Sequence, residues 1–459
     1  MNRASKMPLM QIHIIMLYLN NRSLLKLLKV LLFSYMKPSL TLTLLFLFCL
    51  VNAQHADYAK QIVSTLSSAE YGGRGYVDDG NTLAAGFIRE QFKEIGLKPL
   101  GKKYFQPFKV HVNTFPSRME LYVDNLKLEP GKDFLIDPAS CAIEGVFDVY
   151  LIRKQDLLVK DSLDKVLKNC KGKIVVIDET GFASENKDEL KRANDLIQLI
   201  RHGLEIKNAG TIVLTSDKLS WGIAGQQSSK PSFTVSGNTK INRYSTIKLV
   251  IDARLVEYET NNVIGYISGK SSDSLYLLLA HYDHLGKMGS HIYFPGANDN
   301  ASGVAMLLNL ARYFKSKPLK FPVVFIATTA EEMGIIGSRY FIDHPLIDLK
   351  KIKFLINFDL AGTGEEGIKV VNGTVHRNTF QQLESLNKQG NYLKSVEARG
   401  PACNSDHCMF HNIGVPCFYI YTLGGIQAYH DIYDRPETLP LTEFDDYCKL
   451  MIRFLENMQ

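Results

Sequence analysis

Four short apolar runs from residue 275 onwards each lead into a side chain that commonly binds metal ions. Continuous apolar runs of this length, separated by helical stretches, indicate buried strands of a largely parallel sheet. In such sheets ligands bind at the carboxyl ends of the strands. The runs are 275–280 before His281, 321–327 before Glu331 and Glu332, 353–358 before Asp359, and 415–421 before His430. The sequence therefore predicts an α/β fold in which these side chains meet at one edge of the sheet.

A fifth candidate ligand, Asp299, lies on a glycine-flanked loop with the sequence GlyAlaAsnAspAsnAlaSerGly, residues 296–303. Apolar residues at helical spacing follow the loop and predict a helix. These residues are Val304, Leu307, Leu308 and Ala311. The carboxylate of Asp299 is therefore expected at the amino end of that helix, where capping is the alternative role of an aspartate.

Two imidazoles and three carboxylates suit zinc, which accepts nitrogen and oxygen donors. One zinc ion needs only three or four ligands, whereas five fit two ions if one carboxylate bridges them. The charges of two zinc ions are then balanced by three carboxylates and one hydroxide, so that a buried site is neutral. The predicted metal ligands are His281, Asp299, Glu332, Asp359 and His430.

Glu331 and Asp283 are the predicted catalytic residues. Adjacent side chains of an extended chain point in opposite directions, so Glu331 can act as general base while Glu332 binds metal. Glu331 would take a proton from the attacking water and return it to the leaving amine. Asp283 lies two residues beyond His281, on the same side of the chain, and can hold the second nitrogen of that imidazole.

The length of 459 residues predicts two domains after an export signal. Residues 54–104 contain two helices and form the amino-terminal part of the first domain. Residues 105–255 contain short strands and turns, and no strand end there carries paired ligands, which predicts an inserted β-rich domain without chemistry of its own. Residues 256–459 form the catalytic domain and close on a helix that Thr442 is expected to cap. Its inward-facing residues are predicted to be Phe444, Tyr447, Cys448, Met451 and Leu455.

The amino end has the features of a signal peptide. Met36 and Lys37 begin a short basic region, residues 40–51 are nearly all apolar, and Val51-Asn52-Ala53 fits a cleavage site. Met36 is a second candidate for the first residue of the chain. In that case residues 1–35 would be an over-extension of the gene start. The alternative is a membrane anchor, but this apolar run falls short of the roughly 20 residues that span a bilayer. We therefore expect a secreted or periplasmic protein without a stable membrane span after signal removal.

The formal net charge of +6 does not predict nucleic-acid binding. Six of the 53 basic residues lie in residues 1–53, which contain no Asp or Glu, so the remainder holds 47 basic and 47 acidic residues. This remainder is formally neutral, and no basic patch is implied. The oligomeric state stays open.

Six cysteines follow the predicted cleavage site, and in an exported chain they can become oxidised to disulfides. Cys403 and Cys408 flank AsnSerAspHis and could form a short disulfide, whereas Cys417 lies in an apolar strand and is expected as a buried thiol. The spacing of the cysteines leaves their pairing open.

Taken together, these elements resemble the co-catalytic dizinc aminopeptidases of the bacterial leucyl aminopeptidase type, metallopeptidase family twenty-eight. The resemblance covers nearly all of residues 54–459, and residues 105–255 resemble the protease-associated domain that is inserted in some members. The loop 67–75 and the GlyLeuLysPro segment 96–99 are similar to the amino-terminal signature of that subgroup. The matching elements are His281-Tyr282-Asp283, the loop 296–303, Glu331-Glu332, Asp359 and Tyr429-His430.

The resemblance implies two zinc ions that share Asp299. His281 and Asp359 would complete one zinc site, and Glu332 and His430 the other. It also implies a cis peptide bond between Asp299 and Asn300.

The chain departs from the family pattern at two places. Members often carry Asp where this chain has Asn298, which is not a ligand. After the last histidine, the usual ThrPro step is replaced by Asp431-Ile432, at the rim of the expected substrate pocket.

Several polar residues near the motifs are ambiguous. His284, His291 and His411 are expected as surface or packing histidines. Asp406 and His407 are either supports of the metal ligands or purely structural residues.

Three functions fit these residues. The favoured one is an exported zinc aminopeptidase, a hydrolase that removes amino-terminal residues from peptides; carboxypeptidase and dipeptidase activity stay open, as does the side-chain preference. The second is glutaminyl cyclisation on the same fold, which usually needs one zinc and a Trp in the pocket; the only Trp here, Trp221, lies in the inserted segment. The third is a non-catalytic binding module, which predicts lost ligands.

Overall fold

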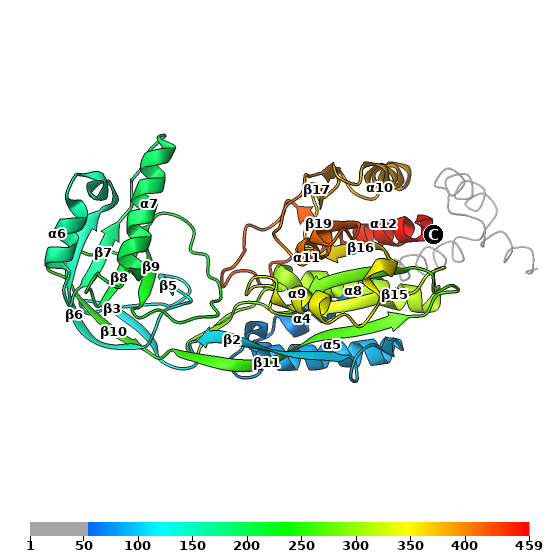
Figure 1. Ribbon diagram of the computed structural model, residues 1–459, viewed down its shortest axis with the longest axis horizontal. Helices are drawn as coiled ribbons and strands as arrows, with labels where there is room; N and C mark the ends of the chain where they lie inside the picture. The colour runs from blue at the N-terminus through cyan, green and yellow to red at the C-terminus, as the bar shows by residue number, and fades with distance from the viewer. Residues whose placement is uncertain (1–53, 459) are drawn as a thin grey trace, which may run out of the picture. The chain divides into compact units, whose positions relative to one another are not determined.

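A computed structural model describes residues 54–458. The predicted signal peptide, residues 1–53, lies outside the described residues. The described chain contains a mixed sheet of nine strands, which carries the predicted ligands, and a second sheet of eight strands (Figure 1). Within residues 54–458, every helix is too short or too polar to cross a bilayer.

The four predicted apolar strands lie side by side in the centre of the nine-stranded sheet and are parallel to one another. In spatial order they are β15 (Val323–Thr328), β12 (Leu275–His281), β16 (Ile352–Phe358) and β19 (Cys417–Leu423). Every residue of β12 and β15 is buried, which accounts for their unbroken apolar sequences. The predicted α/β fold with a mixed, largely parallel sheet is confirmed.

Antiparallel strands extend this sheet on both sides. On one side, β11 (Arg254–Ile267) runs antiparallel to β15 and also pairs with β1 (Lys98–Pro99) and β2 (Phe105–Thr114). On the other, β17 (Gly367–Val371) is antiparallel to β19 and parallel to β18 (Val396–Ala398). Within residues 54–458, the strand ends that carry candidate ligands therefore come together in the parallel centre of the sheet.

Helices cover both faces of the nine-stranded sheet. Tyr276, Leu278 and Ala280 of β12 belong to a core that includes residues of five helices, whereas Leu277 and Leu279 point to the opposite face. Four of these helices are α4 (Gln54–Leu66), α5 (Gly80–Ile95), α8 (Gly303–Ser316) and α12 (Phe444–Asn457). The opposite core includes residues of α9 (Ile336–Asp343) and α11 (His407–Asn412). A further helix, α10 (Arg377–Gly390), contributes Leu383 to the first core.

The start of α12 differs from the prediction. The helix begins at Phe444 after Glu443, and the hydroxyl of Thr442 donates to Glu365 Oε1 at 3.1 Å instead of capping the helix. The predicted cap at Thr442 is therefore wrong, because a nearby carboxylate offers the hydroxyl a charged acceptor. The five residues that were predicted to face inward are all buried.

The eight-stranded sheet is formed by residues between Met119 and Ile251 and packs into two hydrophobic cores, one of which also includes Leu285, Met288 and Phe294 from outside this segment. Its strands are β3 (Met119–Val123), β4 (Leu126–Leu128), β5 (Phe134–Ile136), β6 (Ile143–Arg153), β7 (Ile174–Asp178), β8 (Gly210–Thr215), β9 (Ser232–Ser236) and β10 (Thr246–Ile251). The segment β2 lies within the predicted insert, yet it pairs with β11 of the other sheet. The boundaries 105–255 and the likeness of this part to a protease-associated domain stay predictions.

Two helices of this segment were missing from the sequence prediction, α6 (Ser162–Asn169) and α7 (Lys187–His202). The side chain of Asn186 caps α7 by accepting from the backbone N–H groups of Asp188 and Glu189. Ala193, Ile197 and Ile200 of α7 are buried, the last two in a core with strands β7 and β8. The apolar face of α7 is narrow among many charged residues, so the helical periodicity of this segment is weak in the sequence.

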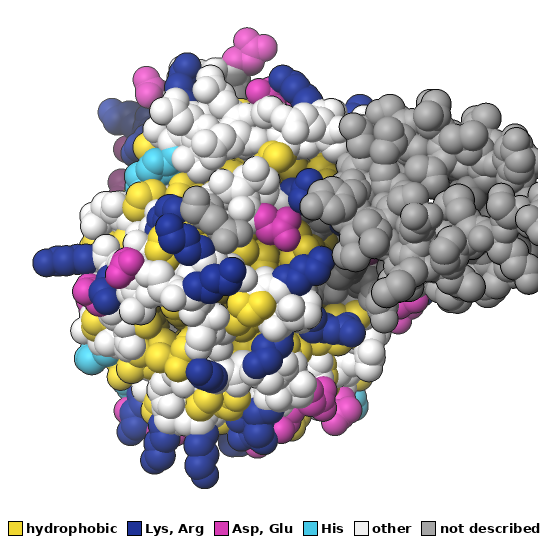
Figure 2. Space-filling view, turned by 90° about the vertical axis from the view of Figure 1, so that its right-hand side faces the viewer, with side chains coloured by type: hydrophobic (Ala, Val, Ile, Leu, Met, Phe, Trp, Pro, Cys, Tyr) yellow, Lys and Arg dark blue, Asp and Glu magenta, His cyan; other side chains and the backbone are white. Residues whose placement is uncertain are grey.

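Figure 2 shows the face at the right-hand side of Figure 1, where the parallel strands begin. Lys and Arg side chains lie there among apolar and acidic ones. The candidate ligands follow the opposite, carboxyl ends of these strands.

Leu278 tests the importance of the buried centre of β12, since its side chain is fully buried. We expect Leu278→Ala to lower the free energy of unfolding by about 2–5 kcal/mol, through lost apolar burial and the cavity that remains. Urea denaturation followed by circular dichroism measures the effect. Leu204→Ala is the matched control, because Leu204 is 72% exposed, and it should change the stability by less than about 0.5 kcal/mol. Equal effects of the two substitutions would contradict this account of the core.

Candidate metal centre and active site

All five predicted metal ligands and Glu331 line one pocket of about 240 Å³. His281 is the last residue of β12, and Asp359 directly follows β16. Glu331 and Glu332 follow β15, and Asp299 lies just before α8. The carboxyl ends of three neighbouring parallel strands thus deliver side chains to one place, as the sequence predicted.

The donor atoms form two groups that share Asp299. In the first group, His281 Nε2 lies 3.5 Å from both Asp299 Oδ1 and Asp359 Oδ1. In the second, His430 Nε2 lies 3.2 Å from both Asp299 Oδ2 and Glu332 Oε2. The two oxygens of Asp299 therefore face two different histidines.

These separations fit the ligand shells of two small cations. Ligands about 2.0–2.1 Å from a tetrahedral zinc ion are roughly 3.3 Å from one another, close to the separations within both groups. The buried Asp359 Oδ1 has no hydrogen-bond donor among the described residues, as expected for an oxygen that binds metal. Two overlapping triplets also have donor atoms within 4.8 Å of one another, His281 with Glu331 and Asp359, and His281 with Asp299 and Glu332. The donor set therefore suits divalent metal ions.

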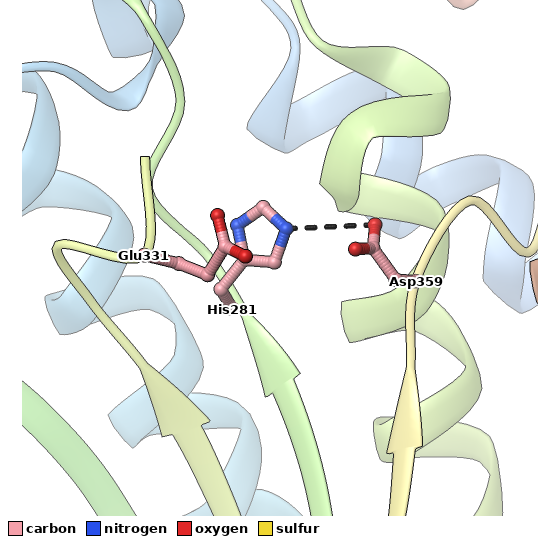
Figure 3. A group of neighbouring side chains, drawn as sticks. All are labelled: His281, Glu331 and Asp359. Carbon is pink, nitrogen blue, oxygen red and sulfur yellow. Dashed lines mark ion pairs between the residues drawn. The ribbon is translucent and has the colours of Figure 1, made fainter. Parts of the chain in front are cut away.

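Glu331 and Glu332 point to different parts of the pocket. Glu332 lies beside His430, whereas Figure 3 shows the carboxylate of Glu331 beside the ring of His281, with Asp359 on the other side of that ring. Glu331 stays partly open to the pocket. The protein around it nevertheless removes enough water to raise the pKa of Glu331 well above its usual value. A carboxylate with a raised pKa is suited to accept and return a proton.

Asp283 contacts both His281 and the two glutamates. Its carbonyl oxygen lies 3.2 Å from His281 Nδ1, so that nitrogen is the donor, and its Oδ1 lies 3.7 Å from the same nitrogen. The carboxylate of Asp283 accepts the backbone N–H groups of Glu331, at 3.2 Å, and Glu332, at 3.4 Å. Asp283 is therefore placed to orient Glu331 and Glu332, a contact that the sequence did not predict, as well as His281.

His284 is a site residue that the sequence analysis missed. It was expected as a surface or packing histidine, but it is fully buried, and its Nδ1 lies 2.8 Å from Glu332 Oε1. Because a carboxylate oxygen accepts, His284 donates this hydrogen bond and fixes one oxygen of Glu332. The other oxygen, Oε2, remains directed at His430. His291, by contrast, is exposed.

Arg74 has no exposed surface and connects two backbone segments of the site, the one after His281 and the loop that carries Asp299. Its guanidinium donates to the carbonyl oxygens of Tyr282, Pro295, Gly296 and Asp299, and also to that of Leu66. Burial lowers the pKa of Arg74 to about 10, against the opposing effect of nearby carboxylates. No sequence pattern connects Arg74 with acceptors more than 200 positions away.

The backbone around Asp299 is fixed on its other side by Asp434. Its carboxylate accepts the backbone N–H groups of Asn298 and Asp299 at 2.8 and 2.9 Å. The peptide bond between Asp299 and Asn300 is cis, which confirms the expectation from the resemblance.

Comparisons with known proteins identify a family for the region that contains the pocket. Residues 262–455 match the model of peptidase family M28. This part of the chain belongs to that family. The matched residues include all five candidate ligands and Glu331. The whole donor set therefore lies within the part of the chain that matches the family model.

Individual relatives are aminopeptidases by name. The chain is 32% identical over 165 residues to aminopeptidase YwaD of Bacillus subtilis, an overlap of 34% of each protein. It is 29% identical over 129 residues to probable leucine aminopeptidase 2 of Aspergillus oryzae, covering 28% of this chain and 25% of that protein. The chain thus matches about a third or less of the length of these curated relatives.

Solved structures share the fold over most of the chain. A zinc aminopeptidase from Bacillus subtilis superposes with a TM-score of 0.64 and 19% identity, covering 88% of this chain and 94% of that one. An aminopeptidase from Aneurinibacillus sp. strain AM-1 gives a TM-score of 0.58 and 20% identity, with 86% and 92% covered. At these identities the likeness establishes the fold.

A disulfide between Cys403 and Cys408 closes the loop that precedes α11. Within the loop, Ser405 Oγ donates to Asp359 Oδ2 at 3.3 Å, and Asp406 accepts a hydrogen bond from the hydroxyl of Thr328. Cys417 is a buried thiol, as expected. The loop therefore supports one candidate metal ligand, Asp359, directly through the hydroxyl of Ser405.

Without a cation, the two candidate histidines hold protons tightly. Burial alone would lower the pKa of His281, but the carboxylates of Glu331 and Asp359 outweigh this effect and raise the pKa well above its usual value. Burial is likewise outweighed at His430, where Glu332 and Asp299 raise the pKa to about 11. A metal ion must displace these protons in order to bind.

Metal binding should therefore release protons at neutral pH. We expect about one proton per bound Zn²⁺ ion, and an affinity that falls as the pH is lowered, because protons and zinc compete for the imidazoles. Calorimetric titrations in two buffers with different ionisation enthalpies measure this release. Identical binding heats in the two buffers would show that the histidines are already neutral.

Proposed function

We propose that this chain is an exported dizinc exopeptidase that removes amino-terminal residues from peptides. The observation that carries the proposal is the arrangement of Asp299, whose two oxygens face His281 and His430 separately. One zinc ion would bind to His281, Asp359 and Asp299, and the second to Glu332, His430 and Asp299. The names of relatives that are called aminopeptidases or a zinc aminopeptidase support this assignment.

Two zinc ions would supply a strongly acidified water molecule and a polarised substrate carbonyl. The protein's own contribution to proton transfer is Glu331, which lies in the same pocket and is held by its backbone N–H to Asp283. Glu331 would take the proton from the attacking water and deliver it to the leaving amine. Asp283 and His284 would keep Glu331 and Glu332 in their separate positions.

The charge of the pocket favours a substrate amine over a substrate carboxylate. Its described lining residues include four carboxylates and contain no Lys or Arg. A carboxypeptidase needs a cation for the terminal carboxylate of its substrate, whereas the protonated amino terminus is attracted by acidic side chains. This argues for aminopeptidase over carboxypeptidase activity.

The other two functions fit less well. A glutaminyl cyclase-like function would place a Trp in the pocket, but the ring of Trp221 stacks on Phe294 and its Nε1 donates to the carbonyl oxygen of Ile136. Trp221 is not among the lining residues of the pocket. A non-catalytic binding module predicts missing ligands, and all five predicted ligands and Glu331 are present.

Substrate specificity tests the proposal directly. Peptides and aminoacyl chromogens with a free amino terminus should be cleaved, and a chelator should abolish cleavage until zinc is restored. The same peptides with an acetylated amino terminus are the control, because they lack the charged amine. Cleavage of blocked and free peptides at equal rates would remove the exopeptidase assignment.

Glu331→Gln separates the base from the ligands. The amide keeps the size of the side chain but cannot accept the proton, so turnover should fall about 10²–10⁴-fold while the zinc content stays at that of the wild type. Turnover with a chromogenic substrate and zinc content by atomic emission are measured on the same sample. Glu185→Gln is the control, since Glu185 is exposed and lies outside the pocket. Loss of zinc in Glu331→Gln would mean that the roles of Glu331 and Glu332 are exchanged.

A further inference from the structure

The loop between β8 and β9 of the eight-stranded sheet contacts the segment that carries His430. Trp221 and His430 form two reciprocal contacts. The backbone N–H of Trp221 donates to the carbonyl oxygen of His430 at 2.9 Å. In turn, His430 Nδ1 lies 3.0 Å from the carbonyl oxygen of Trp221.

The second of these contacts decides which nitrogen of His430 can bind metal. A carbonyl oxygen only accepts hydrogen bonds, so His430 Nδ1 must carry the proton. In the neutral ring, Nε2 then has the free lone pair, and it is Nε2 that lies 3.2 Å from Asp299 Oδ2 and Glu332 Oε2. The Trp221 carbonyl is held in place because the indole ring is buried against Phe294.

Lys218 makes a second connection to the same segment. Its ammonium group donates to the carbonyl oxygens of Gln427, at 2.7 Å, and Tyr429, at 3.1 Å, and pairs with Asp431 Oδ2 at 2.6 Å. All three donors of the lysine are thus directed at residues on either side of His430.

An isolated surface ion pair contributes little to stability, but this one is different in two respects. The Asp431 side chain is only 5% exposed, and it also accepts the N–H of Tyr433 at 2.8 Å. The other two bonds of Lys218 go to backbone carbonyls, so that they restrain the path of the chain itself.

We infer that Lys218 and Trp221 form a latch, residues 218–221, through which the eight-stranded sheet positions His430 for metal binding. The inference rests on the proposed dizinc function. Lys218 is a positioning residue, because it reaches the metal ligand only through the backbone around it. Loss of the latch should weaken the zinc site of His430 and leave the site of His281 and Asp359 intact.

Lys218→Met tests the latch, because Lys218 is 48% exposed and its loss does not open the core. Zinc retention is measured by equilibrium dialysis against a series of chelator concentrations. We expect the wild type to retain two ions, and the variant to release one of them at an about ten-fold lower chelator concentration. Loss of a residue that supports a metal ligand typically weakens metal affinity by about this factor. The melting temperature of the zinc-free protein should fall by only a few degrees, because Asp431 loses its cation while the hydrophobic cores stay intact.

Two further variants make the result specific. Lys218→Arg keeps the charge and the donors and should restore most of the zinc retention. Lys127→Met removes another exposed lysine of the same sheet, which pairs with Glu120 at 3.1 Å, and should behave as the wild type. Unchanged retention in Lys218→Met, or equal weakening of both ions, would overturn the latch. A wild-type protein that binds no zinc would refute the proposed function itself, and the latch with it.

Discussion

The structure of the site depends on a single carboxylate with two partners. Asp299 Oδ1 faces His281, which also lies beside Asp359, while Asp299 Oδ2 faces His430, which also lies beside Glu332. Bringing this many carboxylates into one buried pocket is unfavourable unless positive charge compensates them. In the absence of metal, protons on the histidines supply that charge, which is why the pKa of His430 rises to about 11. Two divalent cations would supply it in the proposed enzyme.

The fold meets this requirement by combining a regular scaffold with irregular supports. Parallel strands place His281, Asp359 and the glutamates at one edge, because their carboxyl ends coincide. Asp299 does not belong to a strand, and its loop is fixed by buried polar partners instead. Arg74 is fully buried and donates hydrogen bonds to the loop carbonyls, while the carboxylate of Asp434 accepts hydrogen bonds from the loop N–H groups. Both polar sides of that backbone are thereby satisfied.

The sequence predicted what depends on periodicity and local spacing. The unbroken apolar runs identified the four central strands, and the residues after them supplied the candidate ligands and Glu331, which the fold brings into one pocket. It did not predict His284 or Arg74, since their partners are distant in the chain and a single buried polar residue leaves no periodic pattern. The same reason explains the error at Thr442, whose hydroxyl prefers Glu365, 77 positions earlier, to the adjacent helix.

Crystallography of zinc-loaded protein, with anomalous diffraction at the zinc absorption edge, tests the central claim most directly. The account predicts two anomalous peaks, one within bonding distance of His281 Nε2 and one within bonding distance of His430 Nε2. The carboxylate of Asp299 should bind one peak through each oxygen. A single peak, or two peaks of which Asp299 contacts only one, would contradict the assignment of Asp299 as the shared ligand.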